Sequence, residues 1–263
     1  MFNPPSFLAN KNKHPRDESI SFKEEGHIYT INGISGNYTS VTTIVHQNFS
    51  HFDPEGVADN LLKNTKKMSD PNYKYFGKTK EDMIEEWNQS GKIASQAGTN
   101  LHADIENYYN GVQVENKSIE FQYFSNFVKD FPELIPYRTE WMVFYEEYKI
   151  CGSIDMVFEN TDGTIQIYDW KRSKGIDYES FGNKCSITPC ISHLPDTNFN
   201  HYSLQLNIYR KILQEKYDKI VSKLCLVILH PDHHEKNYEI IVVPNMDIEI
   251  EDLFKLRKQQ ITN

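Results

Sequence analysis

The stretch from Gly152 to Lys171, GSIDMVFENTDGTIQIYDWK, decides the fold that we expect for this chain. Two largely apolar runs flank Thr161-Asp162-Gly163, and a three-residue loop with glycine in the left-handed position is a common connection between antiparallel strands. This loop predicts a hairpin in which Asp155 faces Asp169. A tighter, two-residue loop would instead pair Asp155 with Trp170 and place the two aspartates on opposite faces.

In the first of these registers, Asp155, Asp169 and Lys171 project from the same face at one end of the hairpin. The remaining positions are apolar, with Val157, Ile165 and Ile167 on the acidic face and Ile154, Met156, Phe158, Tyr168 and Trp170 on the other. A hairpin that is apolar on both faces is covered on both, so we expect it inside a sheet. The alternative is a surface hairpin with exposed ion pairs, which contribute about 0–1 kcal/mol each.

Two carboxylates this close repel each other unless a cation lies between them or one of them takes a proton. Hard oxygen ligands with open coordination positions suit Mg²⁺ or Mn²⁺, which also bind the oxygens of a substrate phosphate. Such an ion supplies a nucleophile and offsets charge on the phosphate, and a nearby lysine orients the attacking water or stabilises the same charge. The hairpin therefore predicts a metal-dependent phosphodiesterase with Asp155, Asp169 and Lys171 as its catalytic residues.

Further motifs accompany the hairpin along the chain. They are Gly98-Thr-Asn-Leu-His102-x-x-Ile-Glu106, Glu140 in Thr-Glu-Trp-Met-Val-Phe, and Gln205-x-x-x-Tyr209. Together with Gly152-x-x-Asp155 and Asp169-x-Lys171, they resemble the PD-(D/E)xK nuclease superfamily. Within it they are similar to the RecB-type exonucleases, which include the mitochondrial genome maintenance exonuclease and the CRISPR-adaptation nucleases. The resemblance covers residues 98–209, and Ile154 replaces the proline of the signature without affecting a metal ligand.

This resemblance implies an α/β, restriction-endonuclease-like fold, a mixed β-sheet flanked by helices, behind an N-terminal helical annex. It also implies that Asp155, Asp169 and the Trp170 carbonyl bind Mg²⁺ or Mn²⁺, that His102 is a candidate to join them, and that Lys171 handles the attacking water. The expected activity is hydrolysis of DNA, as an exonuclease acting on free ends or single strands. An RNA endonuclease and a nucleic-acid-binding protein that does not cut are the alternatives.

The supporting residues each have a second interpretation. His102 and Glu106 lie four apart on one helical face, where they are either ligands or a solvated pair. Glu140 is either a further ligand or a solvated acid of an edge strand. Gln205 and Tyr209 are either contacts to the substrate backbone, as the resemblance implies, or half-buried polar residues of the core.

The rest of the chain divides into an expected annex, residues 1–97, which is a candidate substrate clamp, and a nuclease core, residues 98–263. Gly98 is expected to end one helix, with Thr99 capping the next. The expected helices are residues 80–97, 99–111, 118–131, 201–216 and 247–259, with helical pieces in 40–67. The expected strands are residues 137–149, 153–159, 164–170, 219–229 and 238–243, with a short hairpin in 21–34.

The net charge of −9 argues against a protein that coats nucleic acid non-specifically, since such proteins are usually basic. Residues 61–80 differ, with six lysines and one acid. Within this stretch, Tyr73, Tyr75 and Phe76 alternate with lysines, as in segments on which unpaired bases stack. A flexible basic loop is the alternative. We predict DNA, single-stranded or with free ends, as the partner.

No apolar run approaches the roughly 20 residues that cross a bilayer, and the first residues lack a signal-peptide pattern, so we expect an intracellular protein without membrane partners. The four cysteines, Cys151, Cys185, Cys190 and Cys225, are expected to be reduced thiols in that setting. Cys185 and Cys190 lie near His193 and His201 with spacings that allow a zinc site. We expect neither zinc nor an iron–sulfur cluster there.

Overall fold

The computed structural model describes residues 5–262, which fall into two compact units. Residues 5–50 and 101–262 form the larger unit, and residues 51–100 form the smaller one. The functional division expected between residues 97 and 98 stays a prediction, because packing does not assign a role to either segment. No helix within residues 5–262 combines the length and the apolar character needed to cross a membrane.

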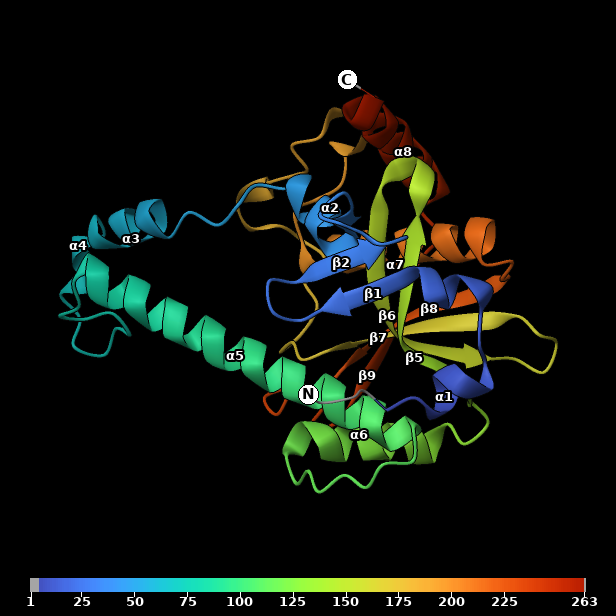
Figure 1. Ribbon diagram of the computed structural model, residues 1–263. Helices are drawn as coiled ribbons and strands as arrows, with labels where there is room; N and C mark the ends of the chain where they lie inside the picture. Colours follow the sequence, from blue (N-terminus) through green and yellow to red (C-terminus); the bar gives the residue numbers. More distant parts are fainter. Residues whose placement is uncertain (1–4, 263) are drawn as a thin grey trace. The chain divides into compact units, whose positions relative to one another are not determined.

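Six strands form one mixed sheet in the larger unit (Figure 1). They are β4 (Thr39–Ser40), β5 (Ile135–Tyr145), β6 (Ile150–Glu159), β7 (Ile165–Lys171), β8 (Val221–Ile228) and β9 (Glu239–Val242). Their order is β4-β6-β7-β8-β9, and β5 pairs with β6. The pairs β4–β6 and β7–β8 are parallel, while β5–β6, β6–β7 and β8–β9 are antiparallel.

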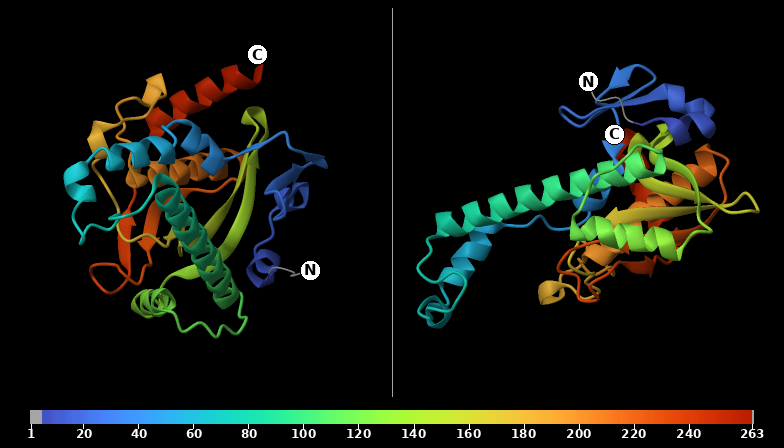
Figure 2. Two further views of the ribbon diagram at one scale, coloured as in Figure 1. Left: turned by 90° about the vertical axis from the view of Figure 1, so that its left-hand side faces the viewer. Right: turned by 90° about the horizontal axis from the view of Figure 1, so that it is seen from below.

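Helices cover both faces of this sheet (Figures 1 and 2). The first face carries α2 (Val41–Gln47), α7 (Asn198–Lys216) and α8 (Asp247–Thr262), and the second carries α6 (Ile119–Asp130) and residues 101–109 of α5 (Lys80–Tyr109). Val157, Ile165 and Ile167 are buried on the first face, and Met156, Phe158, Tyr168 and Trp170 on the second. The predicted α/β fold, a mixed sheet flanked by helices, is confirmed.

The hairpin of β6 and β7 has the predicted register. Met156 pairs with Tyr168 and Val157 with Ile167, which is the register that brings Asp155 opposite Asp169. Gly163 closes the three-residue loop in the left-handed region, with φ 80°. This conformation is the one that glycine adopts without steric cost.

Side-chain caps fix where α6 and α7 begin. The Ser118 hydroxyl accepts a hydrogen bond from the amide of Phe121 at the start of α6. The Thr197 hydroxyl accepts one from the amide of Asn200 at the start of α7. Each cap satisfies an amide that lacks a partner within the helix.

Helix α5 is continuous, so the expected break at Gly98 is wrong. Gly98 has an ordinary helical backbone, and a Cβ atom added there would meet nothing within 4 Å. A glycine inside a helix costs only about 1 kcal/mol relative to alanine, which its neighbours offset. Thr99 accordingly does not cap a new helix, and its hydroxyl donates to the Ser95 carbonyl one turn earlier.

The N-terminal part of the larger unit contains α1 (Phe7–Lys11), the 3₁₀ turn η1 (Pro15–Ser19) and a small sheet of β1 (Ile20–Lys23), β2 (Ile28–Ile31) and β3 (Ile34–Ser35). The hairpin predicted in residues 21–34 is thereby confirmed. Ile20 and Ile31 pack against Phe144 of β5. Residues 5–35 thus belong with the large sheet.

The smaller unit contains α3 (Pro54–Leu62), α4 (Thr65–Met68) and residues 80–100 of α5. The helical pieces expected in residues 40–67 are interrupted at Asp53-Pro54, where the Asp53 carboxylate accepts the Gly56 amide and Pro54 opens α3. Among the remaining turns, η2 (Glu146–Tyr148) joins β5 to β6. The segment between β7 and α7 contains η3 (Phe181–Asn183) and η4 (Pro189–Ile191).

Candidate metal centre

The strands β6 and β7 separate at the end of the hairpin that carries the two aspartates. Their regular pairing stops at Met156 and Tyr168, and nearer its start β6 pairs with β4 at Ile150. In place of a ladder contact, the Asp155 carboxylate accepts the amide of Trp170 through Oδ2 at 3.0 Å. This fork lets side chains of both strands approach one another without a continuous ladder between them.

Glu140 lies opposite Asp155 on β5 and has a left-handed backbone, with φ 41°. Such a conformation costs a residue other than glycine about 1–3 kcal/mol and is kept only where the surroundings fix it. The Thr139 hydroxyl accepts the side-chain amide of Asn110 at 2.8 Å, and the Trp141 indole donates to Asp17 at 3.0 Å. Both neighbours of Glu140 are therefore held.

The regular alternation of faces is interrupted at this position. Ile154 lies in the core of the first face, while Met156, two residues later, lies in the core of the second. The expectation that Ile154 shares a face with Met156 is therefore wrong. The register of β5 and β6 is continuous across this point, so the change of face accompanies the left-handed backbone of Glu140 and not an inserted residue.

His102 of α5 approaches the fork from the second face. Its Nε2 lies 2.9 Å from the Trp170 carbonyl oxygen, and its Nδ1 lies 3.5 Å from Asp155 Oδ2 and 3.8 Å from Glu140 Oε1. Ligand atoms of His102, Glu140 and Asp155 all lie within 4.8 Å of one another. The structure thus brings together three residues that the sequence placed on a helix and two strands.

The Trp170 carbonyl is held in place by the packing of its side chain. The indole ring is 2% exposed and lies edge-on to Phe124 and Phe127, with centroid separations of 5.6 and 5.4 Å. Tyr109 stacks on it at 6.4 Å. This aromatic cluster anchors the backbone whose amide contacts Asp155 and whose carbonyl contacts His102.

Asp169 lies beside this group and is almost completely buried. Its Oδ1 accepts the side-chain amide of Gln205 at 3.0 Å, and its Oδ2 lies 2.7 Å from the Lys171 ammonium. Oδ2 has no partner with hydrogen-bond geometry despite that short approach. This oxygen can therefore accept a second positively charged partner, such as a metal cation, beside Lys171.

The charges of the site raise several pKa values. Burial, followed by the charge of Asp169, raises the pKa of the Asp155 carboxyl above its usual range. Burial alone would lower the pKa of His102, but the carboxylates of Asp155 and Glu140 raise it to about 9. Burial would likewise lower the pKa of Lys171, which the carboxylates of Asp169 and Asp155 raise. Without a metal, these raised pKa values favour the protonated forms of His102, Asp155 and Lys171, which reduces the net negative charge of the site.

These residues fit a hard divalent cation. The donor set consists of carboxylate oxygens, one backbone carbonyl and one imidazole, which suits Mg²⁺ or Mn²⁺. Asp169 Oδ2 has no hydrogen-bond partner beyond its ion pair with Lys171, and the raised pKa of Asp155 indicates a carboxyl group whose charge is not neutralised. Glu106, one turn beyond His102, is not part of the cluster formed by His102, Glu140 and Asp155, and burial raises its pKa to about 7.

Gln205 and Tyr209 of α7 are both buried, with exposures of 8% and 3%. Gln205 contacts Asp169, as described above, and Tyr209 covers Gly152. A Cβ atom added at Gly152 would lie 2.7 Å from the Tyr209 hydroxyl oxygen and 2.9 Å from Cε1. The glycine of the Gly-x-x-Asp motif thus makes room for the tyrosine, and both α7 residues face the site from within.

Two contacts of the site were not expected from the sequence. The Ser153 hydroxyl donates to Glu140 Oε2 at 2.9 Å, and the Lys171 ammonium lies 4.3 Å from the centroid of the Tyr202 ring. Tyr202 precedes Gln205 by three residues and therefore shares its helical face. This spacing is the feature of the sequence from which a place for Tyr202 near the site could have been predicted.

The other predicted residues lie elsewhere. Tyr73, Tyr75 and Phe76 belong to the smaller unit, where the Tyr75 hydroxyl accepts the Trp87 indole at 2.9 Å and Phe76 is 47% exposed. All four cysteines are free, with Cys151 and Cys225 buried. His193 and His201, expected near any zinc, are paired instead with Glu249 and Asp196.

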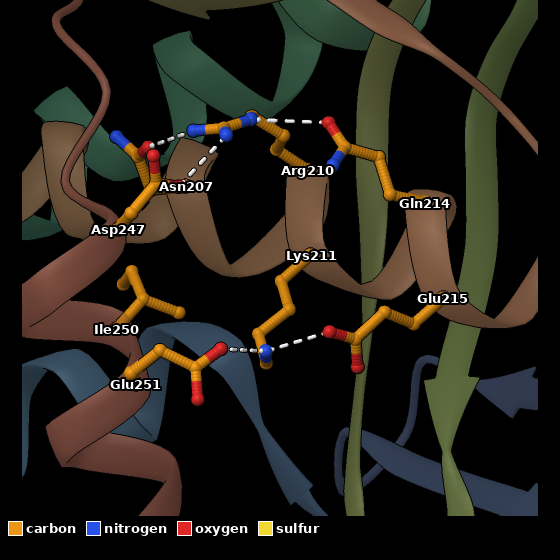
Figure 3. Close-up of a pocket in the computed structure, with 8 residues that line it drawn as sticks. All are labelled: Asn207, Arg210, Lys211, Gln214, Glu215, Asp247, Ile250 and Glu251. Atoms are coloured by element: carbon orange, nitrogen blue, oxygen red, sulfur yellow. Dashed lines mark hydrogen bonds and ion pairs between the residues drawn. The ribbon is translucent and has the colours of Figure 1, made fainter.

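A hollow of about 240 Å³ between α7 and α8 lies apart from these residues (Figure 3). Its charges are paired with one another. Arg210 contacts Asp247 at 2.7 Å and Gln214 at 3.1 Å, and Lys211 contacts Glu215 at 2.7 Å and also Glu251. Because none of the predicted site residues lines it, this hollow is not the candidate centre.

No protein-family model matches the chain, and no curated protein matches its sequence. Among solved structures it is similar to SSO0001, with 15% identity, 86% of this chain and 76% of that one covered, and a TM-score of 0.35. It is also similar to a "Putative exonuclease" from Eubacterium rectale, with 12% identity, coverages of 60% and 71%, and a TM-score of 0.29. Both likenesses are distant, and neither identifies a function for this chain.

Proposed function

We propose that this protein is a divalent-metal-dependent nuclease that hydrolyses DNA phosphodiesters, acting as an exonuclease on free ends or single strands. One observation carries the proposal. Ligand atoms of His102, Glu140 and Asp155 converge within 4.8 Å at the fork, beside the paired Asp169 and Lys171. A cluster of acids with one ammonium has little structural value inside a sheet, because each buried charge must be compensated.

In this proposal Asp155, Asp169 and the Trp170 carbonyl hold Mg²⁺ or Mn²⁺, with His102 and Glu140 as further ligands. Glu106 remains a candidate one helical turn away. When bound, the ion supplies Lewis-acid stabilisation of charge on a phosphate oxygen. His102 must be neutral to act as a ligand, so its binding to a metal is accompanied by release of a proton.

The chain's own residues then divide the remaining work. Lys171 donates to the attacking water or to the phosphate as negative charge develops. Gln205 holds Oδ1 of Asp169 and thereby fixes the plane of that carboxylate. Tyr209 fills the space above Gly152 and supports the strand that carries Asp155. We assign Gln205 and Tyr209 these positioning roles, since their burial leaves little surface for contact with a nucleic-acid backbone.

A substrate-clamping role for residues 1–97 on the core of residues 98–263 remains a proposal, in which the separate unit of residues 51–100 is the structural candidate. Within the smaller unit, Tyr73, Tyr75 and Phe76 are proposed to stack on unpaired bases, and Tyr75 additionally holds the Trp87 indole through its hydroxyl, so it is left unchanged in the test. Replacing Tyr73 and Phe76 by alanine should weaken single-strand binding by about 1–3 kcal/mol per engaged base. Equal affinity of the variant and the wild type would refute the assignment.

The proposed activity is tested with end-labelled and internally labelled DNA and RNA, single- and double-stranded, in Mg²⁺, Mn²⁺, Ca²⁺ or a chelator. Asp155→Asn and Asp169→Asn should abolish cleavage and weaken Mn²⁺ binding measured by calorimetry. Glu159→Gln, at the far end of the strand that carries Asp155, is the matched control and should do neither. Cleavage that persists with chelator, or in both aspartate variants, would exclude the proposed centre.

The same assay separates the alternatives. Cleavage of RNA alone, at internal positions, would identify an RNA endonuclease built on the same centre. Binding of nucleic acid without cleavage in any metal would identify a protein that only binds. The complete set of Asp155, Asp169 and Lys171 disfavours the latter, because clustered acids weaken contact with phosphates.

A further inference from the structure

Helix α7 presents three residues to the candidate centre from one face, namely Tyr202, Gln205 and Tyr209. The last two belong to the motif described above, whereas Tyr202 does not. Its ring is partly buried and packs against the core of the first face. The Lys171 ammonium lies 4.3 Å from the centroid of that ring, within the range of a cation–π interaction.

Three contacts define the position of the Lys171 ammonium, whose side chain is 17% exposed. It pairs with Asp169 Oδ2 at 2.7 Å, lies 3.4 Å from Gln205 Oε1 and approaches the face of Tyr202. The contact with Gln205 is long and therefore weak. The ion pair and the ring are thus the principal restraints.

The ion pair with Asp169 does not hold the ammonium independently of the metal site. Asp169 is also a proposed metal ligand, so a cation bound there would compete with Lys171 for the carboxylate. The face of Tyr202 carries no formal charge and is not a ligand for Mg²⁺, which prefers oxygen donors. The contact with the ring therefore does not depend on that carboxylate.

We propose that Tyr202 is a positioning residue that holds the Lys171 ammonium in place through its aromatic face. The inference rests on the proposed nuclease function for its effect on rate, while the contact itself is independent of that function. Among residues 5–262, no partner is found for a hydrogen bond of the Tyr202 hydroxyl. The ring, and not the hydroxyl, accordingly carries the interaction.

The kinetic test compares Tyr202→Leu, which removes the aromatic face, with Tyr202→Phe, which retains it. Phe199→Leu is the matched control, because Phe199 is a partly buried aromatic residue of α7 that packs against the same core and contacts Tyr178 instead of Lys171. Tyr202→Leu should lower kcat about 3- to 30-fold with KM within two-fold. Tyr202→Phe and Phe199→Leu should stay within about two-fold of the wild-type kcat.

A double-mutant cycle shows whether Tyr202 acts through the lysine. In a Lys171→Ala background, Tyr202→Leu should cause no further loss of kcat. A loss of the same factor as in the wild type would mean that Tyr202 supports the fold or the substrate by another route, and would overturn the proposal. Equal losses in Tyr202→Leu and Phe199→Leu would overturn it as well, by showing general loosening of α7.

A spectroscopic readout keeps this inference separate from the nuclease proposal. In the metal-free protein, the Lys171 ε-methylene signal, assigned by its disappearance in Lys171→Arg, should be shifted upfield by the ring current of Tyr202. The shift should persist in Tyr202→Phe and vanish in Tyr202→Leu. If the wild type fails to cleave but shows this shift, the proposed function fails and the contact stands; an unshifted signal overturns the contact whatever the activity.

Discussion

Replacing Gly152 with alanine tests why the Gly-x-x-Asp motif begins with glycine. A Cβ atom at this position would lie 2.7 Å from the hydroxyl oxygen of Tyr209, 2.9 Å from its Cε1 and 3.2 Å from its Cζ. Ordinary contacts between carbon atoms are about 3.5–4.0 Å. Because Tyr209 is only 3% exposed and packed in the core, its ring cannot swing away without displacing its neighbours.

The expected cost is that of overpacking, about 1–3 kcal/mol in the free energy of unfolding. In urea unfolding, the midpoint should fall while the slope stays unchanged. Gly175→Ala is the control, since an added Cβ there meets nothing within 4 Å, and it should change the free energy by less than about 0.5 kcal/mol.

A double variant shows whether Tyr209 causes the cost. Gly152→Ala combined with Tyr209→Leu should be less destabilised than the sum of the two single variants, by about 0.5–3 kcal/mol, because the shortened side chain leaves room for the methyl group. Strict additivity, or a Gly152→Ala protein as stable as the wild type, would show that the glycine serves another purpose. A strand flexible enough to accept the added methyl group without contacting Tyr209 would give either result.

Three further substitutions test individual residues of the site, of helix α5 and of the ion pair between Glu120 and Arg172. Lys171→Ala should lower turnover by about 10²–10³-fold while binding of nucleic acid in Ca²⁺ stays within a few-fold, and equal losses of binding and rate would contradict its assignment. Gly98→Ala should raise the free energy of unfolding by up to about 1 kcal/mol, because α5 is continuous there, whereas a glycine that ended a helix would give the opposite sign. Burial opposes ionisation of Glu120, but its hydrogen bond with Arg172 at 2.7 Å lowers its pKa. Glu120→Gln should therefore cost about 1–3 kcal/mol at pH 7, and because a lowered folded-state pKa stabilises above the ordinary value of about 4.3, this difference should shrink as the pH falls through the folded-state pKa. Urea unfolding of both proteins at several pH values measures it, and a difference independent of pH would exclude the ion pair as its source.

The sequence alone predicted the hairpin that defines the site, and the structure decided between its two possible registers. Its loop is three residues long with glycine at the left-handed position, and successive side chains of its strands point to opposite faces of the sheet. These signals are local, so they are expressed in any fold that contains the segment. The helix that begins at Ser118 was predictable for the same reason, whereas the mixed sheet was expected from the family resemblance.

Where local preference and packing compete, the sequence alone was insufficient. The glycine at position 98 suggested a break because glycine is intrinsically unfavourable in helices, yet α5 continues through it. Likewise, the strict alternation that placed Ile154 beside Met156 fails at Asp155, where Glu140 takes a left-handed backbone. At Gly98 the flanking helix outweighs the local preference, whereas at Glu140 the backbone is fixed by neighbours that contact residues distant in the chain.

Tertiary structure also decided how the site is assembled. Only packing brings His102 to the Trp170 carbonyl, Tyr209 onto Gly152, and the Tyr202 ring to Lys171. None of these contacts joins neighbouring residues, and each depends on how a helix is docked on the sheet. The sequence determines which chemical groups are available, because it specifies the donors and their spacing along each element, whereas their separations of a few ångströms arise from the packing of helices on both faces of the sheet.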